Sequence, residues 1–511
     1  MNSFLNPNKK PKRNSNTKPI FNPLSCLFLF LSIISLFFIL LSPSSITRFT
    51  FSLKNSPPQC NPKSTAKTLE FLPKGEKYLW YSPHSGFSNQ VSELRNAFLI
   101  GSLLNRTVII PPILDHHAVA LGSCPKFRVS SPYEIRVSVW DHIVHLMQNS
   151  RYVSISDVLD LSSLKHSVKM IDFRVFASLW CGISMDEACS GSLCCGLSQF
   201  TSQWGDLKQC GSLLSGLKYN SDCVYGVTED CRTTVWTLQP NTDGSLDSFQ
   251  PDESLRKKKN ISYIRRRRDL FKAFGPGSKA HVAKVLSFGS LFSAPYNGSQ
   301  LYIDAHDAPA DAYIQPLLGK IEFLPFVAEI LSAGKEFVEK KIRVPFLCAQ
   351  LRLLDGQFKN HWKATFSALR EKIQSLQAQL EGSDKLMNIF IMSDLPPSNW
   401  SGTYLGKLAS DPNSFKIYTL KESDELVSKV AEKLMAREHG IRSGYYPREI
   451  VSMDKRKQCV SSRVLPEVLM YVEETVCSCA SLGFVGTSGS TIAESIELMR
   501  KNNVCLDSNN S

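Results

Sequence analysis

In the second half of the chain, short apolar runs alternate with longer segments whose apolar residues recur every three or four positions. The short runs have the length and composition of buried strands, and the longer segments have the period of helices. This alternation predicts a parallel, doubly wound α/β sheet. The expected strands are 344–353, 388–394, 415–420 and 483–488, and the expected helices are 322–340, 360–380, 402–410, 424–438, 464–480 and 489–501.

The first half opens with the same pattern. A strand in "KYLWYS" leads through the turn "PHSGFSNQ" to a helix at about 87–104, in which apolar residues have helical spacing, and then to the strand "TVIIPP". The strand is β-branched and ends at two prolines, as a buried parallel strand does. The chain therefore reads as two tandem α/β domains, 76–318 and 319–511. Ligands of such sheets bind beyond the carboxyl ends of the strands.

The N-terminus has a different composition. Residues 24–41, "LSCLFLFLSIISLFFILL", carry no charge and are long enough for a short membrane span. Lysines and an arginine precede the run without any acid, so the positive-inside rule keeps 1–23 in the cytoplasm. We expect a type II protein with an uncleaved signal anchor and a Ser/Pro-rich stem at 42–75. A cleaved signal peptide is the competing interpretation.

The cysteines agree with a translocated body. Of the 15 cysteines, Cys26 lies in the apolar run and the others follow it, and seven fall between Cys181 and Cys231. In an oxidising lumen such a cluster predicts disulfides, whereas in the cytosol it would indicate zinc. Disulfides are favoured because two clean C-x-x-C pairs are missing. Sequons for N-glycosylation occur at Asn105, Asn260, Asn297 and Asn399.

The formal net charge of +13 is unevenly spread. Five positive charges belong to residues 1–23, which leaves about +8 for the rest. Much of this excess lies in "RKKK" at 256–259 and "RRRR" at 265–268. The runs have no aromatic ladder, so no nucleic-acid partner is expected. A solvated loop is favoured, and a patch for anionic glycans or lipid headgroups or a processing site are the alternatives.

Three predicted strand ends carry candidate chemistry. The first is the turn "GFSNQ", whose Ser and Asn residues also suit ordinary helix capping. The second offers Arg352, whose guanidinium fork suits a phosphate, although an ion pair with Asp355 would be a purely structural role. The third is "GFVGTSGSTIAES", a Gly/Ser/Thr turn between a strand and a helix that can form a backbone nest for phosphate oxygens. An arginine and a nest together would clamp a diphosphate.

The pieces "GFSNQ…LLNRTVIIPP", "LRLLDG", "IFIMSD" and "FVGTSGSTIAES" occur in this order and with this spacing. In this respect the chain resembles the GDP-fucose protein O-fucosyltransferase family, in its large plant branch, over roughly 77–505. The resemblance implies a GT-B-like fold in which two Rossmann-like domains face a cleft. It also implies GDP-fucose as donor, held mainly by the second domain, with the acceptor on the side of the first.

The resemblance assigns roles to individual residues. Arg352 matches the essential arginine that holds the β-phosphate, and Asn89 matches an asparagine beside the fucose and the acceptor. Asp394 matches an aspartate near the nucleoside. Gln350 stands where the family usually has histidine, and Asp355 lies one residue earlier than the acid of many relatives. The implied substrate-binding residues are Gly86, Phe87, Gln350, Asp355, Asp394, Ser490, Thr491 and Ile492.

Glycosyl transfer passes through an oxocarbenium-like state, and the leaving diphosphate gains negative charge. That charge must be stabilised by a metal or by fixed cations and N–H groups. The chain has no Asp-x-Asp motif, so we expect a metal-independent enzyme without a cofactor. Candidates for the base that activates the acceptor hydroxyl are His84, Glu93, His116 and His117, none of which the sequence singles out.

The sequence therefore predicts an inverting fucosyltransferase of the Golgi membrane that acts on a protein or a cell-wall glycan. Two alternatives stay open. The donor could be another nucleotide sugar, such as UDP-rhamnose, or the chain could be a non-catalytic relative that binds a glycan or nucleotide sugar. The glutamine at position 350 motivates the second alternative.

Overall fold

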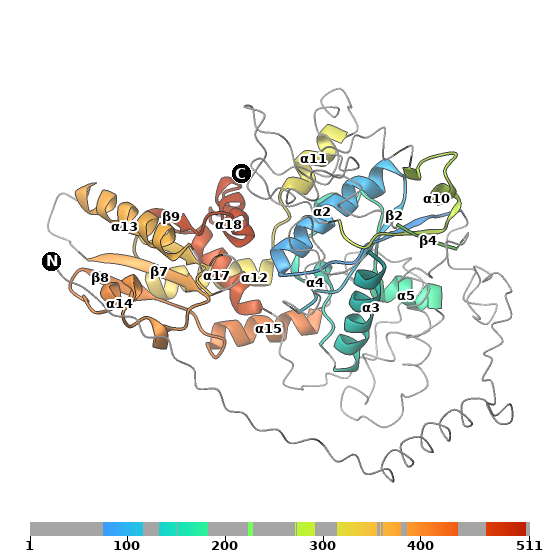
Figure 1. Cartoon of the computed structure of the whole chain (residues 1–511). Coiled ribbons are helices and arrows are strands. Elements are labelled where there is room, and N and C mark those ends of the chain that lie inside the picture. Colours follow the sequence, from blue (N-terminus) through green and yellow to red (C-terminus); the bar gives the residue numbers. More distant parts are fainter. Residues whose placement is uncertain are drawn as a thin grey trace, which may run out of the picture. The chain divides into compact units, whose positions relative to one another are not determined.

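The structure is a computed structural model, and it describes residues 75–115, 132–149, 151–181, 223–227, 271, 273–291, 314–354, 358, 361–379, 386–437 and 467–506. Nine strands in these ranges form two separate sheets, and every strand pairing is parallel. Helices lie between the strands along the chain (Figure 1). The predicted α/β class with two parallel sheets is confirmed.

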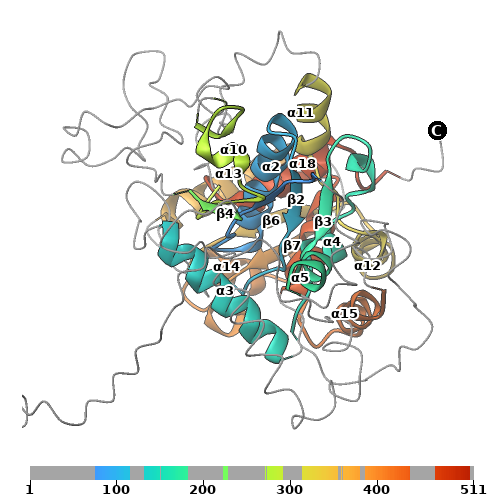
Figure 2. The ribbon, with the colours of Figure 1, turned by 90° about the vertical axis from the view of Figure 1, so that its right-hand side faces the viewer.

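The first sheet has the strand order β3-β2-β1-β5-β4. Helices α2 and α11 lie on one of its faces, and α3 and α5 lie on the other (Figure 2). The strands are β1 (Tyr78–Trp80), β2 (Thr107–Ile110), β3 (Met170–Asp172), β4 (Val224–Gly226) and β5 (Val285–Ser287). The helices are α2 (Phe87–Leu103), α3 (Pro132–Gln148), α4 (Ile155–Val158), η2 (Ser162–Leu164), α5 (Phe173–Cys181), α10 (Lys279–Val282) and α11 (Ile314–Glu322).

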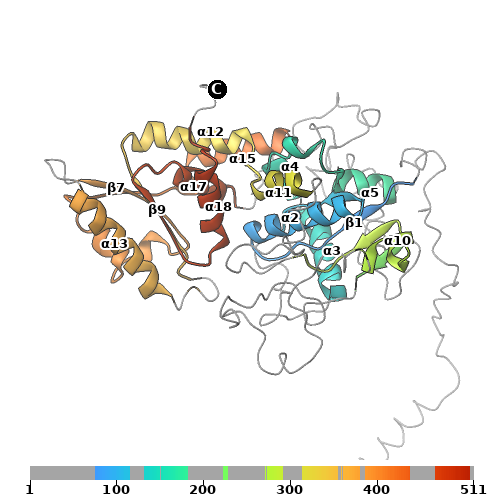
Figure 3. The same cartoon turned by 90° about the horizontal axis from the view of Figure 1, so that it is seen from above.

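The second sheet has the order β8-β7-β6-β9, with β6 paired to both β7 and β9. Helices α12, α15 and α17 pack on one another beside it (Figure 3). The strands are β6 (Leu347–Leu351), β7 (Met387–Ser393), β8 (Phe415–Tyr418) and β9 (Gly483–Gly486). The helices are α12 (Ala328–Phe337), the π-helical η5 (Val338–Ile342), α13 (Trp362–Gln379), η7 (Pro397–Asn399), α14 (Tyr404–Ala409), α15 (Glu425–Arg437), α17 (Val468–Ser478) and α18 (Thr491–Lys501).

Both faces of each sheet are buried, as expected for parallel strands covered by helices. In β1, Leu79 points into the core that contains α2, while Trp80 points into the core that contains α3 and α5. In β6, Cys348 and Leu347 divide in the same way between two apolar clusters. The polar residues Gln350 and Arg352 lie at and just beyond the carboxyl end of β6, at the edge of its sheet.

The helix expected at 322–340 is confirmed from Ala328 onward, where α12 continues through η5 to Ile342, but its predicted start is wrong. The structure has α11 and α12 instead, separated by residues 323–327. Pro325 lies in this gap and cannot continue a helix, because its ring clashes with the preceding turn and it lacks an N–H. Phe326 forms an isolated bridge with Leu159, and its ring stacks at 6.2 Å on that of Phe87. The break thus inserts an aromatic residue into the core.

Two disulfides link elements of the second half. Cys348 of β6 bonds to Cys477 of α17, and Cys479 bonds to Cys505 after α18. Cys223, from the predicted cysteine cluster, is also disulfide-bonded. The other cysteines of that cluster, together with the expected anchor at 24–41, the tail, the stem before residue 75 and the basic runs, lie outside the ranges for which coordinates are described.

Within the described ranges, no helix combines the length and the apolar character that a membrane crossing requires. The sequons at Asn105 and Asn399 are both at exposed positions, at the end of α2 and in η7. Asn260 and Asn297 fall outside the described residues.

We expect the Cys348–Cys477 disulfide to be needed for stability, because it joins positions 129 residues apart. Replacing both cysteines by alanine should lower the free energy of unfolding by about 2–5 kcal/mol, since the unfolded chain gains conformational freedom. Chemical denaturation of the purified protein measures this. An unchanged unfolding midpoint in the double variant would show that the bond contributes nothing.

Candidate active site

Strands β6 and β9 are locked together at their carboxyl ends by Thr487. The Thr487 N–H donates to the Gln350 carbonyl oxygen at 3.0 Å and lies 3.3 Å from the Gln350 side-chain oxygen. The Arg352 N–H donates to the Thr487 hydroxyl oxygen at 2.9 Å. Gln350 and Thr487 are both buried. The two predicted strand-end pieces, "LRLLDG" and "FVGTSGS", therefore form one edge.

The Arg352 side chain is half-buried at this edge. Its guanidinium carbon lies 5.1 Å from the centroid of the Phe358 ring, which is a cation–π contact. A planar guanidinium fork that stacks on an aromatic ring has the geometry to bind a phosphate in its plane. The alternative pairing with Asp355 is not tested, because Asp355 lies outside the described residues.

The turn after β9 leads directly into helix α18. Gly489 has φ +73, a left-handed conformation that glycine adopts without strain. Ser490 is the N-cap residue, is fully buried, and its hydroxyl oxygen has no hydrogen-bond partner in the described part of the chain. The first N–H groups of α18, at Thr491 and Ile492, have no intrahelical acceptor. A helix N-terminus with an unpartnered buried hydroxyl is suited to an anion.

Asp394 follows β7 at the same edge. One of its carboxylate oxygens accepts from the Leu353 N–H at 2.7 Å, and the other accepts from the Leu354 N–H at 3.0 Å. The carboxylate thus holds the backbone on which Arg352 is mounted. The family resemblance places this aspartate near a nucleoside, and the structure adds a backbone-supporting role.

The residues of the "GFSNQ" turn, at the start of α2, differ in burial. Gly86 is the N-cap residue of α2. Phe87 is buried against Phe326 and Tyr471, with ring centroids 6.2 and 4.5 Å away. It is therefore a packing residue that joins α2 to α17. Asn89, by contrast, is half-buried, and its side chain makes no hydrogen bond to the described part of the chain.

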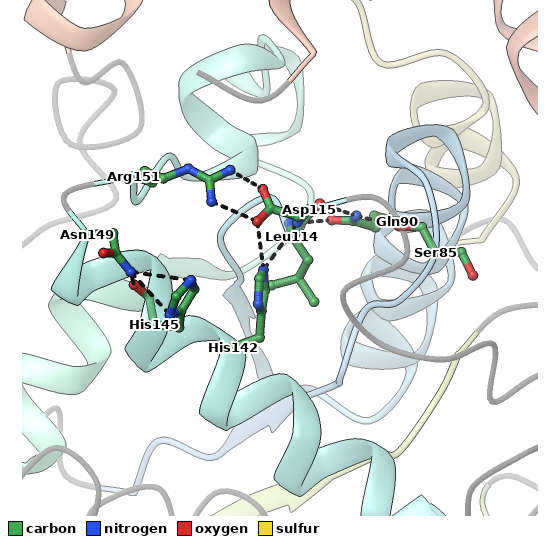
Figure 4. A network of polar contacts seen from close by, with 8 residues as sticks. All are labelled: Ser85, Gln90, Leu114, Asp115, His142, His145, Asn149 and Arg151. Atoms are coloured by element: carbon green, nitrogen blue, oxygen red, sulfur yellow. Dashed lines mark hydrogen bonds and ion pairs between the residues drawn. The ribbon is translucent and has the colours of Figure 1, made fainter. Parts of the chain in front are cut away.

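Gln90 fixes the loop that follows β2 (Figure 4). Its amide nitrogen donates to the carbonyl oxygens of Ser85 and Leu114, both at 2.9 Å, and its carbonyl oxygen accepts from the Leu114 N–H at 3.0 Å. This buried amide therefore clamps the "GFSNQ" turn to the residue that precedes Asp115.

Asp115 is held by its neighbours in the same network (Figure 4). Arg151 donates to its two carboxylate oxygens at 2.6 and 2.9 Å. The His142 Nε2 atom lies 3.5 Å from the carboxylate and 3.3 Å from the Asp115 backbone nitrogen. The pKa of His142 is lowered, mainly by burial. Asp115 is thus an ion-paired carboxylate with both oxygens occupied.

Two of the four base candidates have structural roles. Glu93 is fully buried and accepts from the His84 N–H at 3.0 Å, the Ser290 hydroxyl at 3.0 Å and the Leu291 N–H at 3.2 Å. The ring nitrogens of His84 contact Ser85 and Ser290, and burial lowers the pKa of His84 to about 4. Both side chains belong to the core. His116 and His117 lie outside the described residues.

Sequence reasoning missed Glu467, which precedes α17. Burial raises its pKa to about 7, the positive charge of Arg352 lowers it, and the negative charge of Asp115 raises it further. Arg352 and Asp115, which both act on this pKa, follow strands of different sheets. An acidic residue directly after a proline at a predicted helix start was the available signal.

Among the described residues, no three His, Cys, Asp or Glu side chains are grouped to hold a metal ion. The prediction of a metal-independent site stays a prediction. The cations and donors that the structure places at the edge are Arg352, the Gln350 amide and the N-terminus of α18.

The fold and the candidate site together define an α/β protein of two parallel sheets, with Arg352 and the N-terminus of α18 at the ends of β6 and β9. No family model matches the chain. The curated protein O-fucosyltransferase 30 of Arabidopsis thaliana is 50% identical over 523 residues, covering 99% of this chain and 100% of that protein. The chain therefore belongs to the O-fucosyltransferase family, as its sequence motifs predicted.

Solved structures are more distant. POFUT1 in complex with GDP matches with a TM-score of 0.38 and 10% identity, over 84% of this chain and 96% of that chain. Fucosyltransferase NodZ from Bradyrhizobium matches with a TM-score of 0.33 and 11% identity, over 83% and 94%. Both scores lie below the level from which details of a site can be transferred.

The buried Glu474 gives the stability of this region a pH dependence. Burial raises its pKa to about 8, and a hydrogen bond from the Ser495 hydroxyl at 2.7 Å opposes that rise. Because the folded-state pKa lies above the unfolded value, stability is greatest at low pH and falls as the pH rises toward 8.

We expect Glu474→Gln to reduce this fall, since glutamine cannot ionise. Melting temperatures of the two proteins should converge at pH 5 and separate at pH 8.5, with the variant the more stable. Parallel melting curves across this pH range would contradict the assignment.

Proposed function

We propose that the protein transfers fucose from GDP-fucose to a hydroxyl group of a protein or a cell-wall glycan, with inversion at the anomeric carbon. The observation that carries the proposal is the joint edge of β6 and β9, where Arg352 is tied to Thr487 and where, within the described chain, the buried Ser490 hydroxyl at the N-terminus of α18 has no partner. Membership of the O-fucosyltransferase family supports fucose as the transferred sugar.

For this reaction the protein must stabilise the negative charge of the departing diphosphate, and it need not supply a nucleophile. As the bond from the sugar to the β-phosphate breaks, negative charge grows on the departing oxygen. Arg352 supplies a fixed positive charge for it, and the first N–H groups of α18 supply oriented dipoles. In this mechanism the departing GDP requires no metal ion.

Gln350 takes the place of a histidine of the family without removing a donor. Its side-chain oxygen faces the Thr487 N–H at 3.3 Å, so its NH₂ group is turned away from that partner. An amide NH₂ can donate to a phosphate or sugar oxygen at any pH, whereas a histidine donates from both nitrogens only when protonated. The substitution is therefore compatible with catalysis, and it removes one source of pH dependence.

On the side of the first sheet, the Asn89 side chain is the candidate for binding the transferred sugar or the acceptor. It stands at the start of α2, unpaired within the described chain, beside a turn that Gln90 fixes. We assign it to hydrogen bonding with the transferred sugar or the acceptor. The acceptor side of the reaction would then belong to the first sheet and the donor side to the second.

Arg352→Ala should lower the rate of GDP-fucose hydrolysis by about 10²–10³-fold, as loss of one oxyanion donor does. Arg352→Lys should restore only part of the rate, because an ammonium lacks the two-pronged fork. A suitable control is Arg370→Ala, since Arg370 stacks on Tyr404 at the same 5.1 Å in a different part of the domain.

The control should melt and turn over like the natural protein. If Arg352→Ala folds and hydrolyses the donor normally, Arg352 is not in the active site. If the natural protein hydrolyses UDP-rhamnose but not GDP-fucose, the donor assignment fails. Binding of a nucleotide sugar without any turnover would favour the non-catalytic alternative.

We place the catalytic body in the lumen of the Golgi, anchored by residues 24–41 in type II orientation. The disulfides of the second half and the exposed sequons support a secretory environment. In sealed microsomes, added protease should remove only the N-terminal tail and leave a C-terminal epitope intact. Digestion of that epitope without detergent would refute the orientation.

A further inference from the structure

Glu467 occupies a backbone conformation that a glutamate rarely adopts. Its φ is +61 and its ψ is 19, in the left-handed region, and it is the N-cap residue of α17. A non-glycine residue in this region is strained, and such residues concentrate at functional sites. The conformation fixes the direction in which the side chain leaves the start of the helix.

The Glu467 carboxylate is also unoccupied. It does not cap its own helix, and within the described chain it has no hydrogen bond or ion pair. It is half-buried. A carboxylate that is withdrawn from water without a partner is destabilised in its charged form and is therefore ready to take a proton.

Charged and titratable groups of three elements act electrostatically on Glu467. The positive charge of Arg352, after β6, lowers its pKa, and the negative charge of Asp115, after β2, raises it. Tyr471 and Glu474 lie one and two turns further along α17, and the charge of Glu467 raises the pKa of both. Tyr471 packs against Phe87, with ring centroids 4.5 Å apart, so the first turn of α17 lies beside the start of α2, where Asn89 stands.

Asp115 is the other carboxylate at this place, but its oxygens already accept from Arg151, at 2.6 and 2.9 Å. A general base needs a free lone pair within reach of the substrate and a pKa near the working pH. Within the described chain the Glu467 carboxylate has no partner, and the negative charge of Asp115 makes it more basic.

We propose that Glu467 is the general base of the transfer reaction, an inference that rests on the proposed function. The acceptor oxygen forms a bond to the anomeric carbon while the bond from that carbon to the β-phosphate oxygen breaks. The electron pair of the broken bond leaves with GDP. The proton of the acceptor hydroxyl moves to a Glu467 carboxylate oxygen and is later released to solvent.

Hydrolysis of GDP-fucose tests the role, because water then serves as the acceptor. In the natural protein the rate should rise with pH through about 7, as Glu467 loses its proton. Glu467→Gln and Glu467→Ala should each slow hydrolysis by about 10²–10⁴-fold, the usual contribution of a positioned base. The residual rate should no longer rise between pH 5.5 and 8.5, and affinity for GDP should stay within about threefold of normal.

Rescue by sodium azide distinguishes a general base at position 467 from a residue with a purely structural role. Azide is a nucleophile with no proton to lose, so it should restore turnover in Glu467→Ala and yield fucosyl azide. It should not restore turnover in Arg352→Ala, where the leaving group is unsupported. Glu336→Gln, at an exposed position of α12 where the carboxylate pairs with Lys340 at 2.8 Å, serves as the control and should keep both the rate and the rise through pH 7.

A Glu467→Gln protein with normal turnover or an unchanged pH profile would overturn the inference. So would a loss of turnover that azide fails to restore although GDP still binds normally. Failure of the natural protein to hydrolyse any nucleotide sugar while binding GDP would overturn the proposed function itself, and the role of Glu467 with it.

Discussion

The architecture depends on the complete burial of strand β6. The strand pairs with β7 on one side and β9 on the other, and apolar clusters cover its two faces. A disulfide joins its Cys348 to α17. Such a strand can present polar chemistry only where it ends, so Gln350 and Arg352 emerge together at a rigid edge. Rigid mounting matters because a clamp for developing charge is effective only when its dipoles are already oriented.

The need for a rigid edge explains why hydrogen bonds hold the backbone around Gln350 and Arg352. Thr487 ties the turn after β9 to Gln350 and Arg352, and Asp394 accepts from the two N–H groups that follow Arg352. These contacts are made to backbone N–H groups and fix the main chain on either side of the Arg352 side chain. On the first sheet, Gln90 plays the equivalent part by clamping Leu114 and the "GFSNQ" turn.

Much of the fold could be predicted from the sequence, because each strand and helix of the second half is marked by a local period. The break at Pro325 was missed because apolar spacing alone was followed across a residue that cannot continue a helix. Phe87 was assigned to the site by resemblance, but its ring packs against Tyr471, which is almost four hundred positions away in sequence and cannot be found from a local pattern.

The site was predictable only in part, for the same reason. Arg352 and the turn at Ser490 carry signals in their own residue types, and the resemblance pointed to both. The convergence of Asp115 and Glu467 depends on how strands of two sheets and the start of α17 come together. The burial of His84 and its backbone hydrogen bond to Glu93 also depend on tertiary structure. His84, which the sequence offered as a candidate base, is therefore a core residue. Domain boundaries, and the residues outside the described ranges, stay predictions.

The central claim is that the edge of β6 and β9 holds a diphosphate, and calorimetric titration with GDP and with guanosine tests it most directly. Two charge-assisted hydrogen bonds, each worth about 1.5–3 kcal/mol, should make GDP bind at least about a hundredfold more tightly than guanosine. In Arg352→Ala, most of that difference should disappear while guanosine binds as before. Equal affinities of the natural protein for GDP and guanosine, or an undiminished difference in the variant, would contradict the account.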